Sequence, residues 1–236
     1  GYLCRGEIPI RSMDNARLPV PGWTGEHEWQ GTIPFEELPR LVDPELGYIA
    51  TANNRPVDDD YPYYIALDFT PGFRAERVTK ALLPMENIKT VDMAQVHAER
   101  VSIPAREYIK HLKHVEPQDE LSARAKTKLL AWSGKMDADA VEPTIYSAFR
   151  DALLHAILKH NLGEELAAQA WSPTDRGMGV FLARLKALII TLIPSDDRRL
   201  LPSGEDWPSM MASALSKGTA TLVESLDDDM ETWSWG

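Results

Sequence analysis

The sequence has 236 residues, of which 44% are hydrophobic and 26% charged, a composition that excludes disordered and collagen-like chains. Its 25 basic and 36 acidic residues give a net charge of −11, which argues against nucleic acid as a partner because a phosphate backbone is repelled. The longest purely apolar run covers residues 187–190. Since a membrane-spanning helix needs about 20 such residues, no membrane span is predicted.

Cys4 is the single cysteine, so an internal disulfide and a four-cysteine zinc site are excluded. The sequence opens on Gly1, without an initiator Met or the charged and apolar regions of a signal peptide. It closes on two tryptophans at a bare terminus, Trp233 and Trp235, which we expect a stand-alone protein to cover. We therefore expect the sequence to be a piece of a longer protein.

Proline and glycine divide the chain into two parts. Ten of the 17 prolines and seven of the 14 glycines lie within residues 1–84. Short extended segments alternate there with turn residues, at 18–23, 31–35 and 47–52, which predicts strands and structured loops. Dense prolines confine such strands to sheet edges, because each proline removes a backbone donor. We expect an α+β chain, with a sheet-forming part over residues 1–85 and a mainly helical domain over residues 86–236.

From Ala75 onward, apolar residues recur at spacings of three and four, which predicts helices. The apolar stripes are Leu129, Leu130 and Trp132; Ile145, Phe149, Leu153 and Ile157; and Phe181, Leu185, Leu188 and Leu192. Six prolines are predicted to mark helix starts or ends, namely Pro104, Pro117, Pro143, Pro173, Pro194 and Pro208.

Two polar clusters invite a metal interpretation. His111 and His114 could meet on one helical face, but the flanking lysines and the lack of a carboxylate at matching spacing favour a solvated basic helix end. Residues 58–60 are three aspartates, whose carboxylate oxygens could bind calcium. A polar loop is the more common role for such a run, and both interpretations stay open.

The pair Asn53-Asn54 stands where a strand over residues 47–52 is predicted to end. A side chain mounted on a strand end is held rigidly, and a carboxamide donates N–H groups without a charge that titrates. Such a donor suits an oxyanion hole, where negative charge develops on a carbonyl oxygen. The same dipeptide is common in turns, because asparagine tolerates left-handed geometry. From local sequence alone, the turn is the stronger of the two interpretations.

A series of motifs follows in order along the chain: Arg17-Leu18-Pro19-Val20-Pro21-Gly22, Trp29-Gln30-Gly31-Thr32-Ile33-Pro34-Phe35, Gly47-Tyr48-Ile49-Ala50 with Asn53-Asn54, Tyr61-Pro62, and Phe73-Arg74-Ala75-Glu76-Arg77-Val78. Their order and spacing resemble those of the penicillin acylase (penicillin amidase) family. The resemblance is densest through residues 1–84. In the helical part, the segment 132–136 is similar to the family's Trp-Asp-Gly segment, and residues 233–236 resemble a later motif.

The resemblance implies an N-terminal nucleophile hydrolase, made as a precursor that cuts itself into a small and a large subunit. It implies that the first part of the chain belongs to an αββα layered core and that the helical domain flanks the active-site cleft. In that family, a serine at the start of the large subunit attacks an amide carbonyl and uses its own α-amino group as the base. This chain begins with Gly1, so the resemblance places it within the large (beta) subunit, and we expect the piece alone to be inactive.

The resemblance also assigns site residues. Asn53 matches the family's oxyanion-hole asparagine, and Arg74 matches an arginine that holds the asparagine in register, with a purely structural ion pair as the alternative for Arg74. Some members hold a structural calcium, for which Ala16, through its carbonyl, and Asp68 are the candidate ligands. No cofactor is required for the chemistry. Ala52 stands where penicillin G acylases carry a large aromatic residue, which implies a wider acyl pocket.

The implied function is hydrolysis of linear non-peptide amides, such as acylated β-lactams or N-acyl homoserine lactones. The implied partners are this small-molecule amide and the small (alpha) subunit from the same precursor, and the family's members are mostly periplasmic or secreted. The alternative is a relative that kept the scaffold and lost the chemistry, so that it binds a ligand or a partner without turnover. The missing nucleophile is the observation that supports this alternative.

Overall fold

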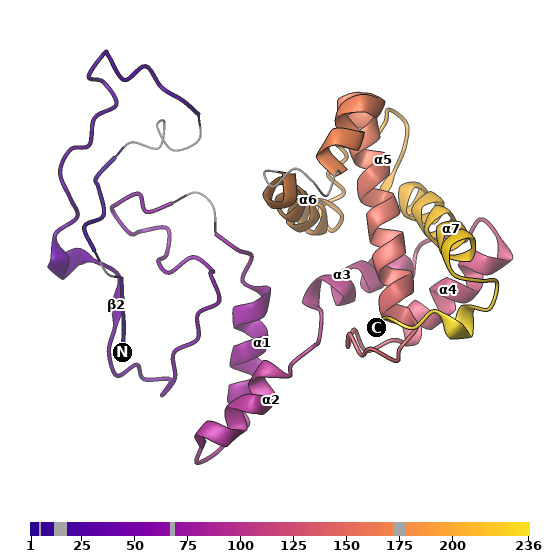
Figure 1. The fold of residues 1–236 in the computed structure, drawn as a ribbon, viewed down its shortest axis with the longest axis horizontal. Coiled ribbons are helices and arrows are strands. Elements are labelled where there is room, and N and C mark those ends of the chain that lie inside the picture. Colours follow the sequence, from indigo (N-terminus) through magenta and orange to yellow (C-terminus); the bar gives the residue numbers. More distant parts are fainter. Residues whose placement is uncertain (5, 12–17, 67–68, 172–177) are drawn as a thin grey trace. The chain divides into compact units, whose positions relative to one another are not determined.

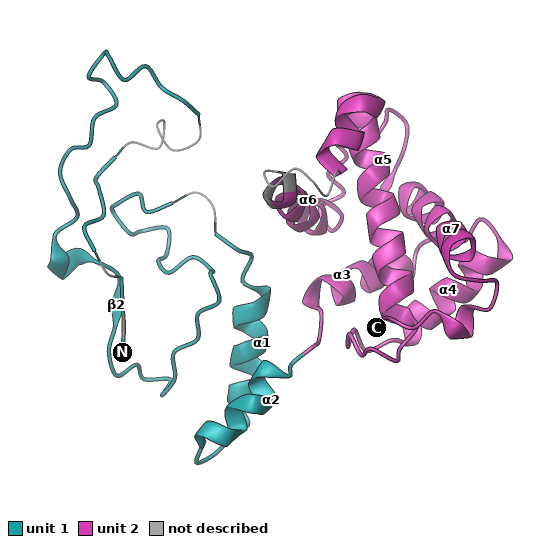
Figure 2. Cartoon of the chain, viewed as in Figure 1, with its two compact units in different colours: residues 1–99 teal, residues 100–236 magenta. Residues whose placement is uncertain are grey.

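Two units divide the chain, residues 1–99 and residues 100–236, referred to as unit 1 and unit 2 (Figures 1 and 2). The structure, a computed structural model, describes residues 1–4, 6–11, 18–66, 69–171 and 178–236. The change in composition near residues 84–88 lies inside unit 1, between its two α-helices. Within the described ranges, no helix has both the length and the apolar character that crossing a membrane requires.

Unit 1 begins with a short antiparallel ladder and ends in two helices. Its elements in order are β1 (Tyr2–Leu3), η2 (Phe35–Glu37), β2 (Arg40–Leu41), α1 (Phe73–Leu82), η3 (Thr90–Asp92) and α2 (Met93–His97). Strand β1 pairs with β2, with Leu3 opposite Arg40, and an isolated bridge joins Pro9 to Thr32. Loops therefore make up most of the described part of this unit.

The strands predicted at 18–23, 31–35 and 47–52 are wrong. In the second segment Thr32 makes one bridge, and neither of the others pairs with a described residue. A strand is stable only when a neighbouring strand bonds its backbone groups, and the alternation of residue types does not reveal whether that neighbour is present. The layered core accordingly stays a prediction.

Unit 2 is mainly helical, which confirms the prediction from apolar spacing. Its elements in order are α3 (Ile103–Leu112), α4 (Glu120–Ala131), α5 (Glu142–Trp171), α6 (Met178–Leu192), α7 (Trp207–Ser225) and η4 (Met230–Thr232). Ser102, Asp119 and Asp206 precede α3, α4 and α7, and each accepts a hydrogen bond from the backbone N–H three residues later, at 3.2, 2.7 and 2.9 Å. These caps satisfy donors that the first turn of a helix leaves unpaired.

Prolines lie at helix ends, as predicted. The second residues of α3, α5 and α7 are Pro104, Pro143 and Pro208. A proline is tolerated there because the N–H groups of the first turn have no partner within the helix. Pro117 precedes α4 and Pro194 follows α6, whereas Pro173 lies outside the described residues.

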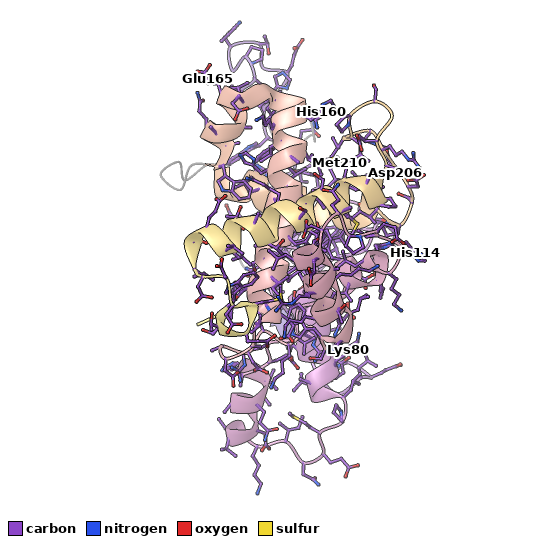
Figure 3. All side chains as sticks on the ribbon, turned by 90° about the vertical axis from the view of Figure 1, so that its right-hand side faces the viewer. Lys80, His114, His160, Glu165, Asp206 and Met210 are labelled. Carbon is purple, nitrogen blue, oxygen red and sulfur yellow. The ribbon has the colours of Figure 1, made fainter. Side chains whose placement is uncertain are left out.

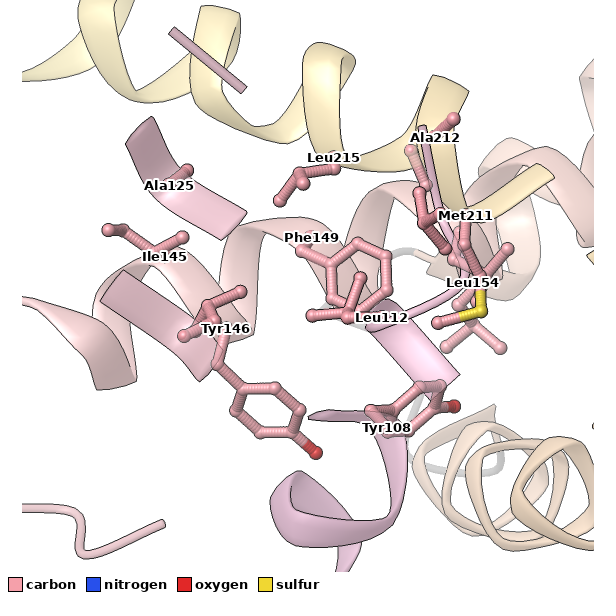
Figure 4. Close-up of a cluster of buried hydrophobic side chains, with 14 of the residues drawn as sticks. Tyr108, Leu112, Ala125, Ile145, Tyr146, Phe149, Leu154, Met211, Ala212 and Leu215 are labelled. Carbon is pink, nitrogen blue, oxygen red and sulfur yellow. The ribbon is translucent and has the colours of Figure 1, made fainter. Parts of the chain in front are cut away.

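The core of unit 2 forms where α5 and α7 pack against each other and against α3 and α4 (Figure 4). The stripe predicted for α5 is at most 1% exposed and consists of Ile145, Phe149, Leu153 and Ile157. Leu215 of α7 is fully buried, and Tyr108 of α3 meets Phe149 edge to face with ring centroids 5.9 Å apart. Removing these side chains from water is the main stabilising contribution to the unit.

The stripe predicted for α6 is partly wrong. Phe181 and Leu188 are 40% and 44% exposed, whereas Ile189 is fully buried and Leu192 is 6% exposed. Helix α6 is apolar on several sides, so the spacing of apolar residues alone does not select the face that packs against the core.

The two C-terminal tryptophans differ in environment. Trp233 is fully buried and donates its indole N–H to the carbonyl oxygen of Asp227 at 3.0 Å, while Trp235 is 45% exposed. The expectation of a bare aromatic terminus is therefore wrong for Trp233. A buried tryptophan needs an acceptor for its indole N–H, and the carbonyl oxygen of Asp227 supplies it.

Helices α5 and α7 approach each other closely at Gly218. A Cβ atom at this position would lie 2.8 Å from the backbone carbon of Ala148 and 2.8 Å from the backbone nitrogen of Phe149. Both contacts involve backbone atoms, which cannot move aside as a flexible side chain can. Glycine at this position therefore fixes the distance between the two helices.

We expect Gly218→Ala to lower the free energy of unfolding by about 1 to 2 kcal/mol, because the overlap outweighs the gain in helix propensity. The control is Gly179→Ala in α6, where an added Cβ meets nothing within 4 Å. That substitution should leave stability unchanged or raise it by up to about 1 kcal/mol. Urea unfolding measures both, and equal stability of the two variants would contradict the prediction.

Candidate active site

Asn53 lies in a turn, not at the end of a strand. Its φ angle is 61°, in the left-handed region where asparagine is enriched. The backbone N–H of Ala52 donates to the side-chain oxygen of Asn54 at 3.0 Å, and the N–H of Thr70 donates to the carbonyl oxygen of Asn53 at 2.8 Å. The prediction of a strand-end mount is therefore wrong, and these turn bonds hold Asn53 in its place.

Arg74 contacts the same turn from helix α1, of which it is the second residue. Its Nη2 atom donates to the carbonyl oxygen of Ala52 at 2.9 Å and to Oδ1 of Asn53 at 2.8 Å. The structure thus brings together the two residues that the sequence marks as catalytic candidates. One guanidinium nitrogen holds both the backbone and the side chain of the turn.

The contact with Arg74 fixes which way the Asn53 amide points. A guanidinium only donates hydrogen bonds, so the atom of Asn53 that faces it must be the oxygen. The Nδ2 group of Asn53, with its two N–H donors, is consequently directed away from Arg74. It has no hydrogen-bond partner within the described part of the chain, and both side chains are exposed. Asn53 thus presents an uncharged donor to an incoming group.

An aromatic hollow of about 570 Å³ occurs elsewhere in unit 1, lined in part by the tyrosines of residues 61–64. The guanidinium carbon of Arg11 lies 5.3 Å from the ring centroid of Tyr64, within the range of a cation–π contact. Arg11 Nη2 also donates to the carbonyl oxygen of Ile65 at 3.4 Å. These contacts hold the segment that contains the Tyr-Pro motif.

Two tyrosines of this hollow are anchored to Glu37. The hydroxyl of Tyr63 donates to Glu37 Oε2 at 2.6 Å, and this bond raises the pKa of Tyr63. The hydroxyl of Tyr61 donates to the carbonyl oxygen of Glu37 at 2.8 Å, and burial raises the pKa of Tyr61. Both hydroxyls therefore stay protonated at neutral pH and act as donors, not as general bases.

No metal site is seen in the described ranges, where His, Cys, Asp and Glu form no group of three that could hold an ion. Asp59, from the aspartate run at 58–60, is paired with Arg55, which agrees with a polar loop. His111 lies in the last turn of α3 beside Lys110, as expected for a basic helix end, and burial lowers its pKa. The calcium candidates Ala16 and Asp68 lie outside the described residues.

Comparison with known proteins decides the family. The penicillin amidase family matches residues 1–236. This chain belongs to the penicillin amidase family. Over 224 residues it is 36% identical to penicillin acylase 2 proenzyme of Pseudomonas sp. (strain SE83), a match that covers 94% of this chain and 29% of that protein.

Two further matches have lower sequence identity. Acyl-homoserine lactone acylase QuiP of Pseudomonas aeruginosa is 25% identical over 255 residues, which cover all of this chain and 30% of that protein. Among solved structures, the thermostable penicillin G acylase from Alcaligenes faecalis matches this chain with a TM-score of 0.71 and 22% sequence identity. The match covers 99% of this chain and 46% of the acylase chain, and it shows a shared fold. The chain thus spans about 30% of the length of these two curated relatives.

Two partners in the site carry no signal in the sequence. The carbonyl oxygen of Ala52 and the N–H of Thr70 both hold the turn through backbone atoms. Every residue except proline offers the same backbone groups, so residue type could not have revealed these partners. Asn53 and Arg74, by contrast, contribute through side chains, which is why their motifs point to them.

We expect Arg74→Ala to loosen the Asn53 turn, because it removes the donor shared by Ala52 and Asn53. Hydrogen exchange of the Thr70 amide, bonded to Asn53, should accelerate about fivefold, since hydrogen bonds from one exposed guanidinium to neutral acceptors contribute modestly to local stability. The amide of Ile33, which bonds Ile8, is the internal control and should be unaffected. The control variant Lys80→Ala removes another cation from α1 and should leave the exchange rates of both the Thr70 and the Ile33 amides unchanged. If Lys80→Ala accelerated exchange at Thr70 as much as Arg74→Ala does, the role of Arg74 would be refuted.

Proposed function

We propose that this chain supplies the oxyanion-stabilising donor of an acylase that hydrolyses linear amides, and that the donor is Nδ2 of Asn53. The observation that carries the proposal is the 2.8 Å contact from Arg74 Nη2 to Asn53 Oδ1. Because that contact occupies the oxygen, the N–H groups remain to bond a substrate. Such preorganised donors commonly make the largest single contribution to acyl-transfer catalysis.

In the proposed reaction, a nucleophile from another part of the protein attacks the amide carbonyl. We propose that it is an N-terminal serine with its own α-amino group as base. The carbonyl oxygen becomes negative as the tetrahedral intermediate forms, and Asn53 donates a hydrogen bond to it. Collapse of the intermediate breaks the C–N bond and releases the amine, which takes the proton held by the base. Water then hydrolyses the acyl-serine to the carboxylic acid.

Arg74 acts in this proposal as a positioning residue. Its Nη2 atom contacts the turn and not the reacting carbonyl, and it holds Asn53 Oδ1 so that the amide cannot flip. The asparagine stays neutral throughout, whereas an aspartate would repel the developing oxyanion. The Asn53 amide thus has Arg74 at its oxygen and offers its Nδ2 group, on the other side, to the oxyanion.

The surface of unit 1 supports a protein partner. Its strongly exposed apolar side chains include Leu18, Trp23, Trp29, Phe35, Val42 and Leu46, which are 60–88% exposed. Single exposed apolar residues are ordinary, but such a number in one unit is typical of a surface that another polypeptide covers. We propose that the cover is the small (alpha) subunit of the same precursor, as the name proenzyme of one relative suggests.

The proposed substrate is a linear non-peptide amide such as an acylated β-lactam or an N-acyl homoserine lactone. Support comes from the relatives, named penicillin acylase and acyl-homoserine lactone acylase. We further propose a periplasmic or secreted location and a structural calcium held by Ala16 and Asp68. No step of the proposed chemistry passes through a metal.

The decisive test is Asn53→Gly in the complete protein. Glycine accepts the φ angle of 61° without strain, and it removes the Nδ2 donor together with the Oδ1 atom that Arg74 bonds, while Arg74 keeps its bond to the carbonyl oxygen of Ala52. We expect kcat for a chromogenic anilide to fall about 10² to 10³-fold, the usual effect of losing one oxyanion donor, while KM changes little. Asn53→Asp, which keeps the shape and adds a negative charge, should be at least as impaired.

Asn87→Gly is the matched control, since Asn87 also has a positive φ angle, 51°. It should keep full activity. An Asn53→Gly variant with more than half the original kcat would refute the role of Asn53. A complete protein that binds an amide without any turnover would favour the non-catalytic alternative.

Arg74→Lys tests the positioning role. Lysine keeps the charge but lacks the planar fork of the guanidinium, so it cannot hold the Ala52 carbonyl and Asn53 Oδ1 in the same geometry. We expect kcat to fall about tenfold at nearly constant KM, with thermal stability unchanged. A fall in stability with unaltered kcat would instead indicate a purely structural role for Arg74.

A further inference from the structure

A groove of about 750 Å³ runs between α5 and α7 within unit 2. One side of the groove is lined by residues of α5, including Ala152 and Ala156, and the other by residues of α7, including Met210 and Lys217. Pro202 and Trp171 complete the wall. We call this feature the α5–α7 groove. His160 and Met210, two of its lining residues, are labelled in Figure 3.

The groove is a consequence of the helix crossing. At Gly218 the two helices touch through the backbone of Ala148, so no side chain fits between them there. Farther along, small side chains such as Ala152 on α5 and Ala214 on α7 leave the space between the helices open. Helix α5 is interrupted at Gly163, where φ is 77° and ψ is 171°, before it reaches Trp171. Trp171 lies against the groove beyond this interruption.

The interior of the groove is mainly apolar. Alanines form much of the lining, and Met210, Pro202 and Trp171 add larger apolar surfaces. The ring of His155 meets Trp171 edge to face with centroids 5.8 Å apart, and Lys186 Nζ lies 5.9 Å from the Trp171 centroid. Trp171 therefore contacts both His155 and Lys186. An apolar ligand tail would find surface there without polar groups to satisfy.

The groove carries one unpaired lysine, Lys217, whereas its other lysine, Lys159, is ion-paired with Glu164. The side chains of Lys217 and His160 are exposed and have no hydrogen-bond or ion-pair partner within the described ranges. The acidic residue of the lining, Asp151, is already balanced by Arg150 at 2.9 Å and Lys186 at 3.7 Å. In a chain of net charge −11, an unpaired lysine beside an apolar groove is complementary to an anion.

We propose that the α5–α7 groove binds a small carboxylate with a single apolar tail, the tail lying on the alanine-lined interior and the carboxylate facing Lys217. The volume of about 750 Å³ lies within the range of small-molecule sites. The two parts of such a ligand match the two parts of the groove. The proposal does not rest on the function proposed for Asn53, because every residue involved belongs to unit 2.

The test uses the complete protein and sodium decanoate as the probe, with binding measured by calorimetry. We expect saturable binding with a Kd of about 1 mM or tighter. Lys217→Gln should weaken it about fivefold, as expected for one partly exposed charge pair. Lys113→Gln, which removes an exposed lysine of the same unit outside the groove, should have no effect.

A second variant addresses the apolar part. Ser213 is an exposed lining residue, so Ser213→Trp places bulk in the groove without disturbing the core, and it should abolish binding. Decylammonium, with the same tail and the opposite charge, should bind at least about fivefold more weakly than decanoate. The Asn53→Gly variant should bind decanoate normally, which separates this result from the outcome for catalysis.

Three results would overturn the proposal. The first is an absence of saturable decanoate binding, which would leave the groove as a surface for another polypeptide segment. The second is undiminished binding by Ser213→Trp, which would place the decanoate elsewhere. The third is equal affinity for decanoate and decylammonium, which would show that the positive charge of the groove selects nothing.

Discussion

Where α5 and α7 cross, any side chain at position 218 would overlap the backbone of Ala148. This close approach buries the apolar stripe of α5, including Phe149, against Leu215 of α7. On another part of the same two helices, small side chains such as Ala152 and Ala214 leave the α5–α7 groove open. One glycine therefore sets the packing of the core in unit 2, and small side chains set the cavity beside it.

A different constraint governs unit 1, where regular structure is scarce. The turn around Asn53 is held by Thr70 on one side and by Arg74 on the other, each through a hydrogen bond of 2.8 Å to an Asn53 oxygen. Since a guanidinium cannot accept a hydrogen bond, the orientation of the Asn53 amide follows from the identity of its neighbour. A loop thus fixes the orientation of a polar side chain, a task that in catalytic sites usually falls to a helix or a strand.

The helices of unit 2 could be predicted because their signals are local. The stripe of α5 from Ile145 to Ile157 and the prolines in the first turns of α3, α5 and α7 are read within one segment of chain. The strands expected in unit 1 failed because pairing depends on a remote partner that alternation does not encode. The prediction of the buried face of α6 was partly wrong for a related reason. Phe181 and Ile189 are both strongly apolar, and only packing against the core distinguishes them. The groove could not be predicted, because alanines in a helix do not indicate a groove until the approach of α5 and α7 at Gly218 is known.

The two interpretations of Asn53, a turn residue and an oxyanion donor, turn out to be compatible. A φ angle of 61° restricts position 53 mainly to glycine, asparagine and aspartate. Glycine has no side chain with which to donate, and an ionised aspartate only accepts hydrogen bonds and carries the charge that an oxyanion would meet. Of these residues, asparagine alone satisfies the backbone and offers an uncharged donor. The turn geometry that suggests a merely structural residue therefore narrows the choice to the residue that the proposed chemistry requires.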